Sequence, residues 1–221
     1  MSETDSTSNV LVLSYLSLRK AVGIIGVSLP FVLVIGKRLV EGPGIEPSIS
    51  DYYYTIMGDV FVGSLCAVGV FLLSYRGYEK KDDLAGDFAC LCSIGVALFP
   101  TRPELASTHL QTNIGRVHYA LATLLFLTLA YFSLVLFRKT NPEKPMTQQK
   151  KQRNVIYKVC GIAMLACIGL LGLNALFPGG PSIQRLHPVF WLETIALLFF
   201  GISWLVKGEA ILTDRDTEEE S

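Results

Sequence analysis

Three side chains with acid–base chemistry interrupt apolar stretches of this 221-residue sequence: Asp59, His118 and Glu193. Each falls close to the start of an expected membrane helix, on the same side of the membrane. A carboxylate facing lipid would be costly, so we expect Glu193 to face the interior of a helix bundle, paired or protonated. One polar layer of this kind could hold the helices together, bind a ligand or lipid head group, or take part in catalysis.

More polar residues lie on the same side, in the run Pro47-Ser48-Ile49-Ser50-Asp51-Tyr52-Tyr53-Tyr54-Thr55. Ser50 or Asp51 could cap the helix that follows or a short turn before it. The three tyrosines fit an aromatic belt at the membrane surface, with buried rings and wet hydroxyls. Our candidate ligand-binding set is Ser50, Asp51, Asp59, Arg116, His118, His187 and Glu193.

The three histidines and the deep carboxylates include enough ligand types for a zinc site. The sequence contains no His-x-x-x-His pair, however, so one helix cannot present two imidazoles to a metal. It also lacks the Gly-x-Ser-x-Gly elbow of a serine hydrolase. We therefore expect no cofactor and keep zinc only as an alternative.

The elements that must position these residues are long apolar helices. Hydrophobic residues make up 51% of the chain and charged residues 17%, against about 25% in soluble domains. Blocks long enough for a hydrocarbon core of about 30 Å predict an all-α, polytopic membrane protein with a six-transmembrane-helix bundle. The expected spans are residues 18–36, 56–75, 84–99, 117–137, 155–177 and 189–206.

Around these spans we expect three regions. Residues 1–17 form a polar N-terminal segment, with room for an interfacial helix at 10–16. Residues 18–206 form the transmembrane domain, and residues 207–221 an acidic cytoplasmic tail.

The basic residues are segregated between the two sides of this bundle. Of the 19 Lys and Arg residues, 14 fall on the side of the N-terminus, and Lys37, Arg38, Arg102, Arg116 and Arg185 fall on the other. Short loops rich in Lys and Arg stay cytoplasmic, which predicts both termini inside a plasma membrane. The candidate set then opens outward.

The expected partners are membrane lipids. No basic stripe with interleaved aromatic residues is present, which argues against nucleic-acid binding. A homo-oligomer is compatible with the sequence.

Two short patterns resemble the six-helix damage-regulated autophagy modulator (DRAM) family and its uncharacterised bacterial relatives. They are Pro47-x-Ile49-Ser50-Asp51 and His118-x-x-x-Ala122-x-x-x-Phe126. The turn Phe99-Pro100-Thr101 is similar to one in the bacterial relatives. The resemblance implies a six-helix bundle and no particular activity.

The residue types are also similar to the Ser, Asp and three-His zinc site of the alkaline ceramidase and adiponectin-receptor superfamily. This chain departs from that superfamily in lacking its His-x-x-x-His pair and its seventh helix.

We therefore expect a membrane protein that binds or senses a lipid or small amphiphile, with Asp59, His118 and Glu193 as polar anchors. The first alternative is a metal-dependent lipid hydrolase, in which His109, His118 and His187 hold the metal and Asp59 or Glu193 activates water. The second is a proton-coupled carrier.

Overall fold

The computed structural model describes residues 3–75, 80–103, 108–140 and 147–212, with side chains from Tyr15 onward. All regular structure in these ranges is helical, as the sequence predicts. The elements are α1 (Glu3–Val40), η1 (Ser50–Tyr54), α2 (Gly58–Leu73), α3 (Lys80–Leu98), α4 (His109–Leu134), η2 (Leu136–Arg138), α5 (Gln148–Leu176), α6 (Pro181–Gln184) and α7 (Pro188–Lys207).

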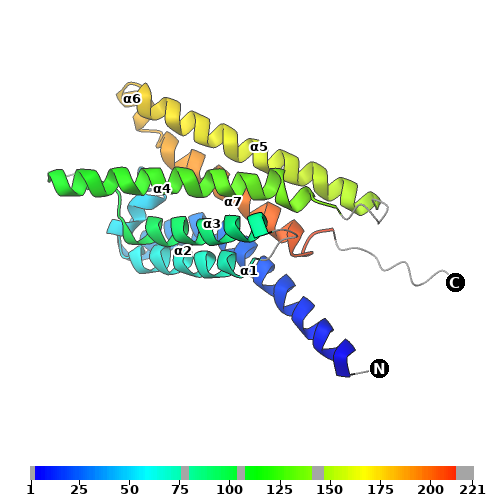
Figure 1. Cartoon of the computed structure of the whole chain (residues 1–221). Helices are drawn as coiled ribbons and strands as arrows, with labels where there is room; N and C mark the ends of the chain where they lie inside the picture. The colour runs from blue at the N-terminus through cyan, green and yellow to red at the C-terminus, as the bar shows by residue number, and fades with distance from the viewer. Residues whose placement is uncertain (1–2, 76–79, 104–107, 141–146, 213–221) are drawn as a thin grey trace.

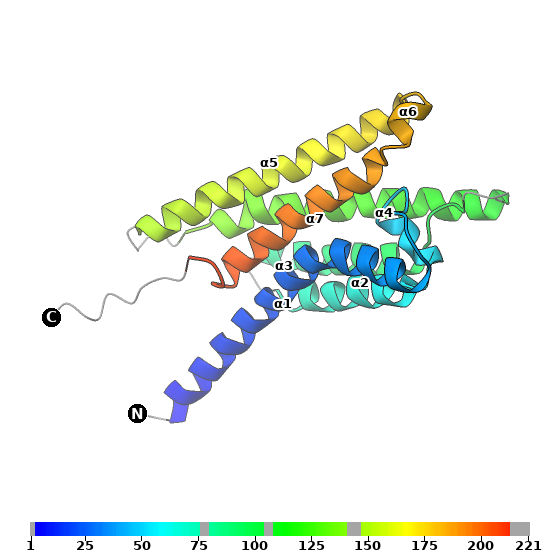
Figure 2. The same ribbon diagram turned by 180° about the vertical axis from the view of Figure 1, so that it is seen from behind.

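Six of these helices form a closed ring. Each long helix contacts the next along the chain, from α1 to α5; α5 then contacts α7, and α7 contacts α1. The α1–α2, α3–α4 and α5–α7 connections gather at one end of the bundle, which we call the outer end (Figures 1 and 2). The start of α1 projects away from the other helices at the opposite, inner end (Figure 1).

Four segments are long and apolar enough to cross a membrane: Tyr15–Val40, His109–Arg138, Gln148–Leu176 and Pro188–Lys207. This makes the chain a membrane-type helical protein. The apolar helix α2 has 16 residues, about 24 Å at 1.5 Å per residue, which is short of a full hydrocarbon core. The described helix α3 is not among the four, because Lys80, Lys81, Asp82, Asp83 and Asp87 occupy its first half.

Several helices begin earlier than the apolar blocks that predicted them. Helix α4 begins at His109, where Thr108 and Gln111 form a reciprocal capping box that satisfies backbone N–H groups. Helix α5 begins at Gln148, capped by the Thr147 hydroxyl. Helix α1 is continuous from Glu3 through the segment expected at the interface. Hydropathy marks the part of a helix that suits lipid, whereas caps decide where the helix begins.

Glycine lets α1 and α7 approach until their backbones touch. A Cβ added to Gly201 would lie 2.7 Å from the Gly23 carbonyl oxygen, and one added to Gly23 would lie 2.9 Å from the Gly201 carbonyl oxygen. Gly26 meets the Phe200 ring in the same way. Small residues permit this approach in lipid, where apolar burial gives helices no net drive to associate.

Aromatic side chains fill the inner end of the ring. The Phe137 ring centroid lies 5.2 Å from that of Trp204 and 5.3 Å from that of Tyr157, and Tyr75 packs edge-on to Phe132 at 4.8 Å. Such edge-to-face pairs add to the stability gained by burying the rings. They join Tyr75, just beyond α2, to α4, η2, α5 and α7 at one place.

The backbone contact of α1 with α7 can be tested by adding one methyl group. We expect Gly201→Ala to lower the free energy of unfolding by about 1–3 kcal/mol, because the new Cβ meets the Val27 side chain and the Gly23 backbone. The matched control is Gly63→Ala, where nothing lies within 4 Å of the added Cβ. Unfolding in mixed micelles measures both. Equal stabilities of the two variants would contradict the contact.

Candidate functional site

The connection between α1 and α2 folds back onto the outer end of the bundle. Its centre is buried, with Ile49 at 3% exposure and Tyr52 at 0%, and Ser48 and Ser50 are buried beside them. The short helix η1 begins within this buried segment. A buried connection must satisfy its own polar groups: Glu193 accepts from a backbone N–H of the connection, and Asp51 accepts from two hydroxyls.

Asp51 joins the α1–α2 connection to the α3–α4 connection. Its Oδ2 accepts a hydrogen bond from the Ser48 hydroxyl, and its Oδ1 accepts one from the Thr101 hydroxyl, each at 2.7 Å. The Asp51 backbone N–H donates to Ser48 Oγ at 3.0 Å. The Tyr54 hydroxyl donates to the Thr101 carbonyl at 2.5 Å. Two of these hydrogen bonds fix η1 against Thr101, just beyond the end of α3, and the two between Ser48 and Asp51 hold the α1–α2 connection together.

Glu193 joins the same connection to α7. Its Oε2 accepts a hydrogen bond from the Ile49 backbone N–H at 2.7 Å, and the Ser50 N–H lies beside the same carboxylate. One turn earlier, the Phe190 N–H donates to the Pro47 carbonyl at 3.0 Å. Glu193 therefore faces the bundle, in the direction expected from its cost in lipid.

His118 is buried in α4 at 1% exposure, and its Nδ1 lies 2.5 Å from the Phe99 carbonyl oxygen. A carbonyl only accepts, so Nδ1 carries the proton in this contact. Phe99 is two residues before Thr101, which places His118 next to the Asp51 network. The imidazole ties α4 to the end of α3.

The structure brings four of the candidate residues into one region: Ser50, Asp51, His118 and Glu193. Asp59 is in the first turn of α2 on its exposed face, and Arg116 is exposed on α4 beside Asn113. His187 precedes α7 in a left-handed conformation, with φ of 51°. These last three residues do not join the hydrogen bonds of the other four.

Neither Ser50 nor Asp51 makes the helix cap that the sequence suggested. Helix α2 begins after Met57 without a side-chain cap, and η1 begins after Ile49. Ser48 accepts the Asp51 N–H instead, while the Asp51 carboxylate reaches another connection.

Burial also affects the tyrosines of this region. It raises the pKa of Tyr54, and the neighbouring Tyr53 and Asp51 raise it further. The hydroxyl stays protonated at neutral pH and donates to the Thr101 carbonyl. Burial likewise raises the pKa of Tyr52.

The histidines do not form a metal site within the part of the chain that the structure describes. His109 is exposed at the start of α4, His118 is bonded to a carbonyl, and His187 lies before α7. No group of three His, Cys, Asp or Glu residues close enough to hold a metal ion occurs among the described residues.

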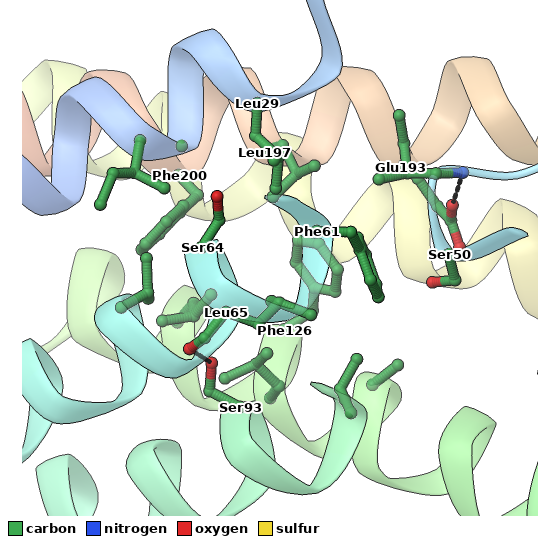
Figure 3. Close-up of a pocket in the computed structure, with 18 residues that line it drawn as sticks. Leu29, Ser50, Phe61, Ser64, Leu65, Ser93, Phe126, Glu193, Leu197 and Phe200 are labelled. Carbon is green, nitrogen blue, oxygen red and sulfur yellow. Dashed lines mark hydrogen bonds between the residues drawn. The ribbon is translucent and has the colours of Figure 1, made fainter. Parts of the chain in front are cut away.

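Beneath the polar outer layer, the helices line a partly open cavity of about 60 Å³ (Figure 3). Helices α1, α2, α3, α4 and α7 all contribute to its wall. Its polar lining consists of Ser50, Ser64, Ser93 and Glu193, of which the Ser93 hydroxyl is bonded to the Leu65 carbonyl at 2.7 Å. The other lining residues are Ile25, Gly26, Leu29, Ile49, Phe61, Leu65, Val68, Val96, Ala122, Leu125, Phe126, Leu129, Leu197 and Phe200.

Sequence reasoning missed Thr101, Ser48 and the cavity. Thr101 is buried at 1% exposure and bonds both Asp51 and Tyr54, yet in sequence it is one polar residue after a helix-ending proline. The Phe61, Ser64 and Phe126 side chains sit in apolar helices where nothing marks the wall of a cavity.

The fold and site define a class: an all-helical, membrane-type bundle with a small apolar cavity beneath a hydrogen-bonded carboxylate layer. We found no match to the chain among protein-family models, curated proteins or solved structures. The resemblance to the DRAM family stays a prediction.

Substituting Asp51 and Asp59 separately compares a residue of the outer hydrogen-bond network with an exposed one. We expect Asp51→Asn to lower the free energy of unfolding by about 1–3 kcal/mol, because an amide nitrogen cannot accept from Ser48 or Thr101. Asp59→Asn, at an exposed position, should change it by less than about 0.5 kcal/mol. A double-mutant cycle of Asp51→Asn with Thr101→Val measures their coupling. Additive effects would contradict the link between the two connections.

Proposed function

We propose that this protein binds a lipid or small amphiphile, with the apolar part in the bundle cavity and the polar head at Glu193. The observation that supports this proposal is the carboxylate in the lining of an otherwise largely apolar cavity. Ligand sites of this type combine an apolar wall with a few polar groups that orient the ligand.

The wall determines the kind of ligand. Phe61, Phe126 and Phe200 face the space together with leucine, isoleucine and valine side chains. At about 60 Å³ the cavity is well below the roughly 300–1,000 Å³ of drug-sized sites. It suits a short alkyl chain, or the end of a longer one.

The charge of the site determines the head group. No Lys, Arg or His is among the lining residues, and Asp51 is a second acidic side chain that acts on Glu193. Glu193 meets only backbone donors among the interactions above, those of Ile49 and Ser50. An amine or hydroxyl head would donate to this carboxylate, and a cationic head would also interact favourably with the phenylalanine rings. A carboxylate head would be repelled by Asp51 and would find no basic side chain in the lining.

We further propose that all six ring helices cross a plasma membrane with both termini inside. Antiparallel neighbours in the ring and the segregation of Lys and Arg support this topology. In this arrangement the bilayer becomes thinner beside the short helix α2. The carboxylate layer then opens to the outer leaflet.

Ligands with one chain and three head groups test the binding proposal. In detergent-solubilised protein we expect octylammonium to bind more tightly than octanol, and octanoate most weakly, by isothermal titration calorimetry. Ala122→Leu fills the cavity and should abolish binding of all three, because Ala122 lines it. Glu193→Gln should remove the preference for octylammonium and leave octanol bound.

The matched control is Ala120→Leu, the same change on the exposed face of the same helix. It should bind all three ligands as the unmodified chain does. Equal loss of binding in the Ala120→Leu and Ala122→Leu chains would contradict a site in the cavity, as would a chain that binds none of the three ligands.

Introduced cysteines test the topology, in a chain whose five native cysteines are replaced by serine. Ser182→Cys in α6 and Gln152→Cys in α5 are both exposed and lie at opposite ends of the bundle. In intact cells we expect a membrane-impermeant maleimide to label the Ser182→Cys chain, and to label the Gln152→Cys chain only after the membrane is opened. The reverse pattern would show that the termini lie outside.

A further inference from the structure

The wall of the cavity is thinnest on one side of the bundle. Its lining residues are buried except for six, which are Ile25, Ser64, Ala122, Phe126, Glu193 and Leu197. Four of these six belong to α4 and α7, and two to α1 and α2. In the ring α5 stands between α4 and α7, yet α5, which is described over its whole length, contributes no lining residue. The cavity is therefore least covered where α4 and α7 face each other.

The same faces of α4 and α7 are closed toward the inner end. On α7, Glu193 is half-buried, whereas Phe200 and Trp204 on the same face are 2% and 1% exposed. On α4, Thr123 is exposed, and Ala130, about two turns later on the same face, is 0% exposed. The gap between the two helices is therefore confined to the outer half of the bundle.

The divergence of α5 from α4 leaves this gap uncovered. A Cβ added to Gly161 would meet the Leu134 side chain, so α5 touches α4 near the inner end of α4. Gly172 and Thr123 each lie 11 positions from that contact toward the outer end, about 16 Å at 1.5 Å per residue. Gly172 is on the same face of α5 as Gly161, yet nothing lies within 4 Å of a Cβ added to it. Figures 1 and 2 show the two helices separating toward the outer end.

The α1–α2 connection covers the outer end of the cavity. Ile49 and Ser50 belong both to this connection and to the lining, and they are 3% and 8% exposed. The Glu193 carboxylate holds Ile49 in place through its backbone N–H. A ligand arriving from the outer aqueous phase would have to displace this hydrogen-bonded connection, whereas the gap beside α4 needs no such rearrangement.

Apolar side chains flank the gap. Leu127 of α4 is 42% exposed, and Leu165 and Leu176 of α5 are 39% and 74% exposed. They belong to two of the segments that are long and apolar enough to cross a membrane, His109–Arg138 and Gln148–Leu176. In a bilayer the gap would therefore open toward lipid chains.

We propose that the ligand is an amphiphile dissolved in the bilayer, which enters the cavity sideways between α4 and the α5–α7 pair. This inference rests on the ligand site proposed above and gives that site its source. The alkyl chain passes between Thr123 and Gly172, and the head group stays at the outer edge of the gap. Tyr119 lies at that edge, because its side chain is 55% exposed and the charges of Asp51 and Glu193 act on it.

Trp204 can report the arrival of a ligand. It is 1% exposed, and its ring centroid lies 6.3 Å from that of Phe200, which lines the cavity. The chain has two tryptophans, so Trp191→Phe leaves Trp204 as the only one. Bromine quenches tryptophan fluorescence at short range. An octylammonium with a terminal bromine should therefore quench Trp204 once its chain enters the cavity.

The experiment obstructs the gap in the full-length Trp191→Phe chain, reconstituted in phosphatidylcholine vesicles. Stopped-flow fluorescence follows quenching by the brominated octylammonium, and its reversal by an excess of octylammonium. We expect Gly172→Phe to slow both rates about tenfold and to change the dissociation constant less than about twofold, because an obstacle in the path raises the barrier equally in both directions.

The matched control is Leu170→Phe, on the opposite side of α5 at a position that is 50% exposed. It should leave both rates unchanged. Equal rates in the Gly172→Phe and Leu170→Phe chains would overturn the sideways route and leave the cavity as a binding site. Slower quenching without slower reversal would also overturn it, because the substitution would then have weakened the site and not blocked the path.

Two further results complete the test. Quenching that does not saturate in the Trp191→Phe chain would overturn both the route and the function proposed above. Where Gly172→Phe does not purify, Thr123→Phe on the facing helix should slow the same two rates about tenfold, and unchanged rates would overturn the route.

Discussion

The direct contact of α1 with α7 closes the ring, and the cavity exists because the ring is closed. Helices that follow one another along the chain can pair through short connections, but α1 and α7 are separated by the whole bundle. Gly23 and Gly201 allow their backbones to touch at a place where larger side chains would hold them apart. Since apolar burial gives no net attraction between helices in lipid, close packing must supply the stabilisation. The wall of the cavity is completed by this pair.

Closing the ring leaves the α1–α2 connection lying across its outer end, where backbone polar groups have little access to water. The Glu193 carboxylate accepts from the Ile49 backbone N–H, and the Asp51 carboxylate accepts from the Ser48 and Thr101 hydroxyls. The same side chains place two carboxyl groups at the outer end, above an apolar space. The two residues that meet this structural requirement are also those that would select a donor or cationic ligand in the function we propose, in keeping with the strength of hydrogen bonds to charged groups.

The two ends of the bundle differ in charge. At the outer end, carboxylates meet backbone N–H groups and hydroxyls, and at the inner end Arg19, Lys150, Arg153 and Lys207 converge on three helix ends. Cations near a helix C-terminus are stabilised by its dipole, which helps Lys207 at the end of α7. The excess of positive charge at one end fits the segregation that orients membrane proteins.

The sequence by itself determined that the chain is helical, where its apolar helices lie, and that Glu193 faces the bundle, because these follow from local hydropathy and the cost of charge in lipid. It could not determine which polar residues meet. Asp51 pairs with Thr101, 50 positions away, whereas Asp59 stays exposed although its sequence position is near the start of a helix at the same end of the bundle. The rotation of each helix about its axis decides such pairings, and that rotation is set by packing against neighbours. The tertiary structure therefore decided the polar network, the cavity and the meeting of basic residues at the inner end.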